Sequence, residues 1–499
     1  MKVQPDFRAF AANFASGKPG LVWSTFVYDC ETPVSAMLKL ADGKPMSFLF
    51  ESVEGGTVLG RYSFIGIKPD LIWRAHRDTA EINRFALTDP DSFVPCQDMP
   101  LNSLRALIKE STIPIPDELP PMAAGLFGYL GYDTIRWVEK IPDTNHDALD
   151  IPDAILVRPT IIAVFDNIAR TVTVITPVRP VHGLTPTSAY DLARERLSNV
   201  IADLKRCLPD IKETTKAKAL AEPVSNTPRA RYLEMVEIAK DYITAGDVFQ
   251  VVPSQRFSVP FPLSPLSLYR ALRRLNPSPF LFVMNFGQFA TVGSSPEILV
   301  RLRGGRVAVR PIAGTRPRGT TVAEDHALAA DLLADPKERA EHLMLLDLAR
   351  NDVGRVAKIG SVEVTESCQI ENYSHVMHIV SHVEGTLRAD CDILDALMAG
   401  FPAGTVSGAP KVRAMEIIDE LETERRGLYA GCVGYFGAGG DMDTCIVLRT
   451  GLIKDGTLYV QAGGGVVYDS DPEAEFVETQ NKAKALIRAA EEAIALAVD

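Results

Sequence analysis

The sequence contains no uncharged apolar run of about 18 residues, the length that a membrane-spanning helix requires. Its first twenty residues mix Lys2, Asp6, Arg8 and Lys18 with short apolar pieces and contain no signal-peptide core. Positive charge is also scarce: 52 Lys and Arg against 64 Asp and Glu give a net charge of −12. Nucleic-acid phosphates need a clustered basic surface, so this balance argues against a nucleic-acid binder. We therefore expect a cytoplasmic protein whose ligands are small molecules.

The sequence also lacks cysteine-pair motifs. The seven cysteines are odd in number and form no C-x-x-C motif, which argues against a disulfide framework or a zinc site. We predict reduced and mostly buried thiols at Cys30, Cys96, Cys207, Cys368, Cys391, Cys432 and Cys445.

The chain itself, at 499 residues, is long enough for two or three domains. Residues 212–228 are polar, lack aromatic side chains and end in turn-forming residues, which predicts a linker. We therefore predict an N-terminal structural and regulatory region, 1–211, and a C-terminal catalytic domain, 229–499.

Hydrophobic patterns predict an α+β fold. Strands followed by helices, without strict βαβ alternation, indicate layered sheets flanked by helices. β-branched and apolar runs predict strands at 46–52, 160–165, 171–176, 249–257, 280–286, 297–302, 307–311 and 376–384. Helical spacing predicts helices at 188–207, 229–244, 322–333, 336–350, 409–424 and 472–498.

Two of these helices each contain an E-x-x-E pair. Residues three apart lie on one helix face, so Glu338 with Glu341, and Glu475 with Glu478, each project two carboxylates together. One such pair alone is most often a solvated surface. Two facing pairs could hold one magnesium ion and leave room for water and a substrate carboxylate.

Two glycine-containing segments and one histidine segment also carry polar chemistry. Gly463–Gly465 could turn consecutive amides toward an anion, although a tight turn explains them as well. Residues 403–411 fail the phosphate-loop spacing because Pro410 separates glycine from lysine. His375, His378 and His382 would share a helix face, but their β-branched neighbours predict a strand, which excludes a metal triad.

The order of the segments is more specific than any one of them. It runs VFQVVPSQRF, SSPE, PIAGTRPRG, KERAEHLMLLDLARND, YSHVMH, PAGTVSGAPK, GLYAGCVGYFG and QAGGGVVYDSDPEAEFVETQNKA. Over 227–490 this order resembles the chorismate-utilising enzymes. The segments 50–66 and GLFGYLGYD at 125–133 resemble the N-terminal region of the component I class of anthranilate synthases.

The resemblance implies a layered, sandwich-like chorismate-binding fold and a set of site residues. It makes Glu341 and Glu478 the magnesium ligands, with Glu338 and Glu475 in support. It makes Glu297 the acid that helps the C4 hydroxyl leave and His378 a residue that assists proton removal, with Thr405 and Lys482 nearby. The implied substrate contacts are Gly314, Thr315, Tyr429, Arg449, Gly463, Gly464 and Gly465.

The implied activity is that of an anthranilate synthase large subunit, a magnesium-dependent carbon–oxygen lyase that converts chorismate and ammonia to anthranilate and pyruvate. Relatives that activate water carry a lysine where this chain has Gln250. Relatives that aminate C4 carry a lysine where it has Ala313. A pyruvate-retaining aminodeoxyisochorismate synthase, an aminodeoxychorismate synthase and a tryptophan-binding sensor remain alternatives.

The resemblance also implies control and a partner. Glu51, Ser52, Asn276, Pro279, Phe280 and Leu281 are similar to a tryptophan-feedback pocket, with Phe50, Phe280 and Leu281 departing from the usual pattern but remaining apolar. A fused glutaminase needs a G-x-C-x-G elbow, which AGCVG around Cys432 does not supply. Ammonia would then come from a separate glutamine amidotransferase subunit in a hetero-oligomer.

Overall fold

The computed structural model describes residues 2–41, 43–54, 58–209, 219–373 and 376–498. Its α-helices are α1 Phe7–Ala15, α2 Pro33–Leu40, α3 Pro100–Glu110, α4 Pro186–Leu204, α5 Arg229–Ala245, α6 Pro265–Leu275, α7 Val322–Ala334, α8 Pro336–Val356, α9 Ile393–Gly400, α10 Gly404–Ser407, α11 Lys411–Leu421 and α12 Pro472–Val498. Two 3₁₀ turns span Pro121–Ala123 and Tyr132–Trp137.

The strands of the first half are β1 Gly20–Val27, β2 Ser47–Glu51, β3 Val53–Glu54, β4 Val58–Leu59, β5 Tyr62–His76, β6 Thr79–Asn83, β7 Val94–Pro95, β8 Gly125–Leu130, β9 Ala154–Asp166 and β10 Thr171–Val178. Those of the second half are β11 Val224–Ser225, β12 Gln250–Val251, β13 Ser254–Pro260, β14 Phe280–Asn285, β15 Phe289–Ser295, β16 Ile298–Arg303, β17 Arg306–Val309, β18 Ile312–Pro317, β19 Glu363–Asn372, β20 Val376–Thr386, β21 Gly408–Ala409, β22 Cys432–Gly437, β23 Met442–Ile446, β24 Thr450–Lys454 and β25 Thr457–Gly463.

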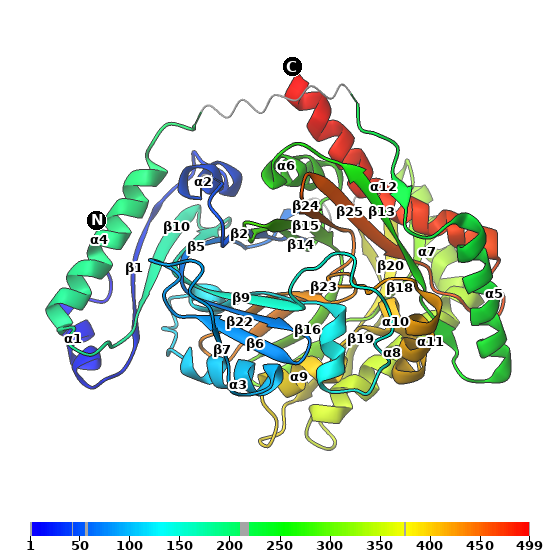
Figure 1. The fold of residues 1–499 in the computed structure, drawn as a ribbon, viewed down its shortest axis with the longest axis horizontal. Coiled ribbons are helices and arrows are strands. Elements are labelled where there is room, and N and C mark those ends of the chain that lie inside the picture. The colour runs from blue at the N-terminus through cyan, green and yellow to red at the C-terminus, as the bar shows by residue number, and fades with distance from the viewer. Residues whose placement is uncertain (1, 42, 55–57, 210–218, 374–375, 499) are drawn as a thin grey trace.

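Most strands belong to one antiparallel sheet that divides into two arms. From β5 one arm runs through β2, β14, β15, β24 and β25 to β13. From β9, which pairs with β5, the other runs through β8, β22, β23, β16 and β17 to β20. Figure 1 shows the two arms as stacked layers with helices outside them. The predicted α+β fold with layered sheets is confirmed.

Aromatic side chains fill the space between the arms. Phe48 on β2 stacks on Phe127 of β8 with ring centroids 4.8 Å apart, and Phe64 meets Tyr435 of β22 edge-on at 6.0 Å. Alternating side chains on a strand point to opposite faces, so each arm sends its other row of apolar residues to the helices outside. That outer packing buries α6 and α12 against one arm and α9 against the other, while α4 packs on β1 and β10.

The two halves of the chain share this sheet. β2 of the first half pairs with β14 of the second, and β8 pairs with β22. The predicted boundary therefore divides the sequence, but the parts on either side of it contribute strands to one sheet. Of the predicted linker, residues 212–218 lie outside the described residues.

Most predicted elements are present with small shifts. The predicted strand 249–257 is two strands, β12 and β13, which pair with different partners; Pro253, which has no N–H to donate, lies between them. The 376–384 stretch is a strand, as predicted, and His375 lies outside the described residues. All seven cysteines are free, but the prediction that most are buried was wrong, since only Cys432 and Cys445 are buried. No helix among the described residues is long and apolar enough to cross a membrane.

Candidate active site

A buried glutamic acid lies where β15 ends and β16 begins. Glu297 is 7% exposed, and its carboxyl group accepts hydrogen bonds from the Thr405 hydroxyl at 3.2 Å. Burial raises the pKa of Glu297 to about 8, because the Thr405 hydrogen bond and the charge of Arg449 offset little of the desolvation. The group is therefore a neutral acid at pH 7. We call the surroundings of this residue the Glu297 site.

A histidine with a fixed tautomer belongs to the same site. His378 on β20 lies with Nδ1 2.8 Å from the carbonyl oxygen of Gly314 and 3.2 Å from the Thr315 hydroxyl. A carbonyl only accepts, so Nδ1 carries the proton and Nε2 has the free lone pair. Burial lowers the pKa of His378, which keeps the ring neutral at pH 7.

The carbonyl that fixes this histidine depends on a glycine. Gly314 has φ of +71°, a region that side-chain-bearing residues rarely adopt. A Cβ atom there would also lie 3.1 Å from Oε2 of Glu338. The PIAGT turn thus places His378 and the first acidic helix close together.

A cation and a phenol complete the polar part of the site. Arg449 follows β23 in a left-handed conformation, φ +48°, and its charge acts on both Glu297 and Tyr373. Within the described part of the chain, its guanidinium has no hydrogen bond or ion pair with another side chain. Burial lowers the pKa of Arg449 and raises that of Tyr429 to about 12, so the arginine stays charged and the phenol neutral.

Each glycine of the triple contacts a different polar residue. A Cβ atom on Gly463 would lie 2.9 Å from the Tyr429 hydroxyl, and one on Gly464 would lie 2.7 Å from Oε2 of Glu475. One on Gly465 would lie 2.7 Å from Nε2 of Gln250. The amide of Gly464 donates to the carbonyl of Pro253 at 3.2 Å. The glycines therefore serve close packing here, and the anion loop suggested by the sequence stays a prediction.

The two acidic pairs lie on α8 and α12, as predicted. α8 packs on β18 and β20, and its first turn is capped by Asp335, whose carboxylate accepts from the amides of Lys337 and Glu338. α12 packs on β25. Glu341 is close enough to both Glu338 and Glu478 for their charges to raise its pKa, with burial as the larger cause.

These carboxylates fit a hard divalent cation. Oε2 of Glu475 is buried without a hydrogen-bond partner, and burial and the charge of Glu478 raise the pKa of Glu475. Lys482 offsets part of this charge, since its Nζ lies 2.7 Å from Glu478 and 2.9 Å from the carbonyl of Gly463. Among the described residues no three His, Cys, Asp or Glu side chains form a preformed metal cluster. A cation held by two glutamates would take its other oxygens from water and substrate.

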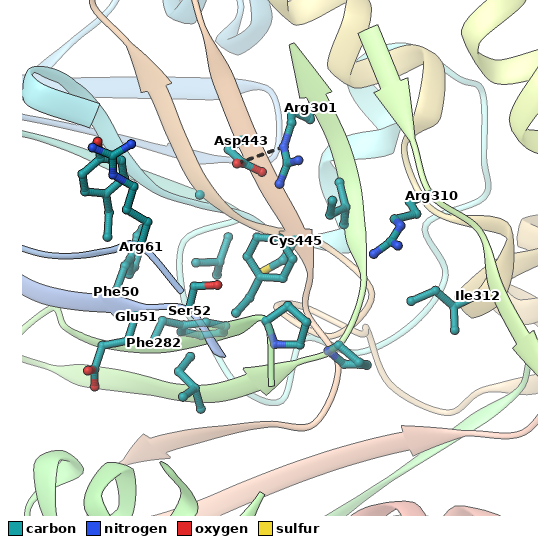
Figure 2. Close-up of a pocket in the computed structure, with 18 of the residues that line it drawn as sticks. Phe50, Glu51, Ser52, Arg61, Phe282, Arg301, Arg310, Ile312, Asp443 and Cys445 are labelled. Carbon is teal, nitrogen blue, oxygen red and sulfur yellow. Dashed lines mark hydrogen bonds and ion pairs between the residues drawn. The ribbon is translucent and has the colours of Figure 1, made fainter. Parts of the chain in front are cut away.

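A cavity of about 1020 Å³ lies between the two arms, and we call it the Ser52 cavity. Ser52, Pro279, Phe280 and Leu281 line it, as does Glu51. Figure 2 shows that the Glu51 carboxylate points away from Ser52. It instead accepts a hydrogen bond from the Tyr269 hydroxyl and two from the Arg273 guanidinium, the latter at 2.8 and 3.1 Å. These bonds fix α6.

Asn276, the sixth residue predicted for this pocket, does not line the cavity; its carbonyl accepts from the Ser294 hydroxyl. The sequence reasoning missed most of the remaining wall. Arg301 and Arg303 both pair with Asp443, at 3.1 and 2.9 Å, and Figure 2 shows the first pair beside Cys445. Alternation along β16 and β23 could have placed these residues on the inner face, but only once their pairing was known.

Comparisons with known proteins agree over nearly the whole chain. The model of the chorismate binding enzyme family matches residues 68–488. The anthranilate synthase component 1 of Cereibacter sphaeroides is 58% identical over 488 residues, 98% of each chain. Anthranilate synthase component I from Streptococcus pneumoniae superposes with a TM-score of 0.76 at 37% identity, over 86% of this chain and 92% of that one. The menaquinone-specific isochorismate synthase of Escherichia coli, 18% identical, shares the fold with a TM-score of 0.69 over 97% of this chain and 100% of that one.

Proposed function

Because the chain belongs to the chorismate binding enzyme family, we propose that it is an anthranilate synthase large subunit. It converts chorismate and ammonia to anthranilate and pyruvate, the first committed step of tryptophan biosynthesis, as a carbon–oxygen lyase. The observation that carries this proposal is a neutral carboxylic acid and a neutral imidazole in one site with an uncompensated arginine. Those three groups suit a dianionic substrate that must gain one proton and lose another.

Glu297 acts as the general acid. Ammonia adds at C2 of the ring, the double bonds shift, and the C4 hydroxyl leaves with the proton that Glu297 donates. Hydroxide is a poor leaving group and water is a good one, so protonation of the C4 hydroxyl is the step that most requires general-acid catalysis. The pKa of about 8 keeps Glu297 protonated at pH 7, and the Thr405 hydroxyl holds its orientation.

His378 acts as the base of the second half-reaction. Its Nε2 takes the C2 proton of aminodeoxyisochorismate, enolpyruvate leaves, and the ring becomes aromatic. The Gly314 carbonyl holds the proton on Nδ1, which leaves the lone pair on Nε2 for the base role that we propose. Aromatic stabilisation drives this elimination, so a base of ordinary strength suffices.

Arg449 and the acidic helices bind the two substrate carboxylates. Arg449 pairs with one of them, and Tyr429 donates a hydrogen bond from its neutral phenol. Gly314, Thr315 and Gly463–Gly465 form the walls against the substrate. Glu341 and Glu478 would hold magnesium, with Glu338 and Glu475 in support. Bound there, the ion would neutralise the second carboxylate and so favour binding of the dianion.

Two side chains select ammonia and C2. Gln250 is buried, donates to Glu341 at 3.3 Å and cannot remove a proton from water, so ammonia is the nucleophile. Ala313 is buried on β18 and offers no amine for a covalent intermediate. We further propose that a separate glutamine amidotransferase subunit supplies the ammonia, because the chain carries no glutaminase elbow.

We assign the Ser52 cavity to tryptophan as a feedback inhibitor. Part of its lining is aromatic and apolar, from Phe50, Phe280 and Leu281, and would cover an indole ring. The Ser52 hydroxyl, which Figure 2 shows turned toward the centre of the cavity, suits the polar end of an amino acid.

One assay tests the proposal. The purified chain with chorismate, magnesium chloride and ammonium chloride should produce fluorescent anthranilate, and glutamine should not replace ammonium. Accumulation of a non-aromatic amino acid would instead indicate a pyruvate-retaining enzyme. Tryptophan binding without chorismate turnover would indicate a sensor.

A further inference from the structure

We propose that Arg426, together with Glu422, positions the substrate-binding segments of the Glu297 site, an inference that rests on the proposed function. Arg426 follows α11 and is 2% exposed. Its guanidinium contacts no reacting group of the mechanism above. It contacts instead the backbone carbonyls of Val406, next to Thr405, and of Val252, close to Gln250.

The guanidinium joins two segments that are far apart in sequence to a carboxylate four residues before it, that of Glu422. One terminal nitrogen donates to the carbonyl of Val406 at 2.7 Å, next to Thr405. The other donates to the carbonyl of Val252 at 2.6 Å, two residues after Gln250. Its remaining donors bond the carboxylate of Glu422 at 2.6 to 3.2 Å.

Glu422 extends the link to the glycine triple. Its Oε1 accepts from the amide and the hydroxyl of Ser254, at 2.8 and 2.7 Å. Ser254 lies opposite Gly463 in the ladder between β13 and β25. The Arg426–Glu422 pair therefore holds the Thr405 turn, the Gln250 strand and the start of the glycine triple in one arrangement.

The same arginine supports the phenol of the site. The guanidinium carbon lies 5.5 Å from the ring centroid of Tyr429, and the backbone carbonyl of Arg426 accepts from the Tyr429 amide at 3.3 Å. On its other side it lies 4.8 Å from the ring of Tyr132. A planar fork with five donors can make all of these contacts at once, whereas a lysine ammonium cannot.

The chain supplies a matched control in the neighbouring residue. Arg425 is also buried, at 6% exposed, and its side chain pairs with Asp133, Asp143, Asp147 and Asp153 at 3.2 to 3.6 Å. It contacts none of the three segments through its side chain. Arg425→Lys therefore disturbs a buried ion network of similar depth without touching the substrate-binding segments.

The test compares R426K and R425K in the full chain with chorismate, ammonium and magnesium, below the melting temperature of each. We expect R426K to raise KM for chorismate at least fivefold above R425K, with kcat/KM down about 10- to 100-fold, because misplaced binding groups cost this much. KM for ammonium should stay within twofold. A loss of folded protein would lower kcat alone and leave KM unchanged.

Glu422→Gln provides a second variant if R426K does not fold, since the amide oxygen can still accept from Ser254 while the charge pair is lost. It should raise KM for chorismate in the same direction. Equal chorismate KM values in R425K and in the folded variant of the pair would overturn the role of Arg426. A wild-type chain without anthranilate formation would overturn the proposed function instead.

Discussion

The Glu297 site and the Ser52 cavity differ in whether their arginines have carboxylate partners. In the Ser52 cavity Glu51 is bonded to Arg273, and Asp443 is bonded to Arg301 and Arg303, although Oδ1 of Asp443 is buried without a hydrogen-bond partner. In the Glu297 site, as far as the described residues extend, the Arg449 guanidinium has no ion-pair partner, and Oε2 of Glu475 is likewise buried without a donor.

This difference indicates the ligands that each region suits. Unpaired buried charge is costly unless a ligand supplies its partner. The Glu297 site therefore suits a dianion with a cation, which together would satisfy Arg449 and the glutamates. Arg301 and Arg303 in the Ser52 cavity already have a carboxylate partner, so the cavity suits an uncharged ring. The Ser52 hydroxyl and Oδ1 of Asp443 remain for a zwitterionic end.

The largest expected effect comes from removing the acid. Glu297→Gln keeps the size of the side chain and its acceptor for Thr405 but cannot protonate the leaving hydroxyl. We expect kcat to fall about 10²- to 10⁴-fold, the usual contribution of a general acid. Steady-state anthranilate fluorescence measures it. Turnover within threefold of wild type would show that another group delivers the proton.

A second variant removes a carboxylate that the proposal gives to magnesium. Glu478→Gln should lower turnover about 100-fold or more at 1 mM magnesium, since a catalytic metal supplies several kcal/mol of charge stabilisation. Tryptophan binding, followed by calorimetry, should stay within twofold because Glu478 does not line the Ser52 cavity. If turnover persists and its magnesium dependence is unchanged, the metal assignment is wrong.

The pH dependence is the next test. In the proposed mechanism Glu297 donates a proton, so kcat should fall about tenfold per pH unit above its pKa of about 8. The lowered pKa of His378 places the acid limb below pH 6.5. In Glu297→Gln the alkaline limb should disappear. An alkaline limb that remains would belong to another group.

The carboxyl group of Glu297 should also change the pH dependence of the free energy of unfolding, in the direction opposite to that of an ion-paired acid. Its folded pKa lies above the unfolded value of 4.5, so the native state binds the extra proton between these values. Stability is therefore lost as pH rises from 4.5 toward 8, by at most about 1.4 kcal/mol per unit. Glu297→Gln should raise the melting temperature more at pH 8 than at pH 5. An equal shift at both would contradict a buried neutral acid.

The sequence predicted the elements of the Glu297 site better than their contacts. The spacing of the two E-x-x-E pairs predicted helices, and the β-branched run around His378 predicted a strand. Both predictions rest on local patterns and are confirmed. That Gly463–Gly465 pack against Tyr429, Glu475 and Gln250 depends on how β25 meets α12 and β12, which no local pattern encodes.

The Ser52 cavity shows the same limit more strongly. Its wall joins β2 of the first half to β14, β16 and β23 of the second, so its lining follows from strand pairing over long separations. Resemblance located Ser52 and Pro279–Leu281, but it could not show that the Glu51 carboxylate is turned to Arg273. Arg426 was missed for a related reason, because its partners at Val252 and Val406 are backbone carbonyls that leave no residue-type signal.

The smallest expected effect on turnover comes from filling the Ser52 cavity. Ser52→Leu replaces the hydroxyl that would meet the inhibitor's polar end. It also adds bulk beside Gly60, where an added Cβ atom would lie 2.6 Å from the Ser52 side chain. Loss of one hydrogen bond to a charged group, at about 1.5–3 kcal/mol, should weaken tryptophan inhibition by about 10- to 100-fold. Uninhibited kcat should stay within twofold, while Ser47→Ala, at the start of the strand that ends just before Ser52 and outside the cavity lining, should leave inhibition unchanged. Inhibition that survives Ser52→Leu would place the inhibitor elsewhere and would leave the cavity's paired charges with a structural role alone.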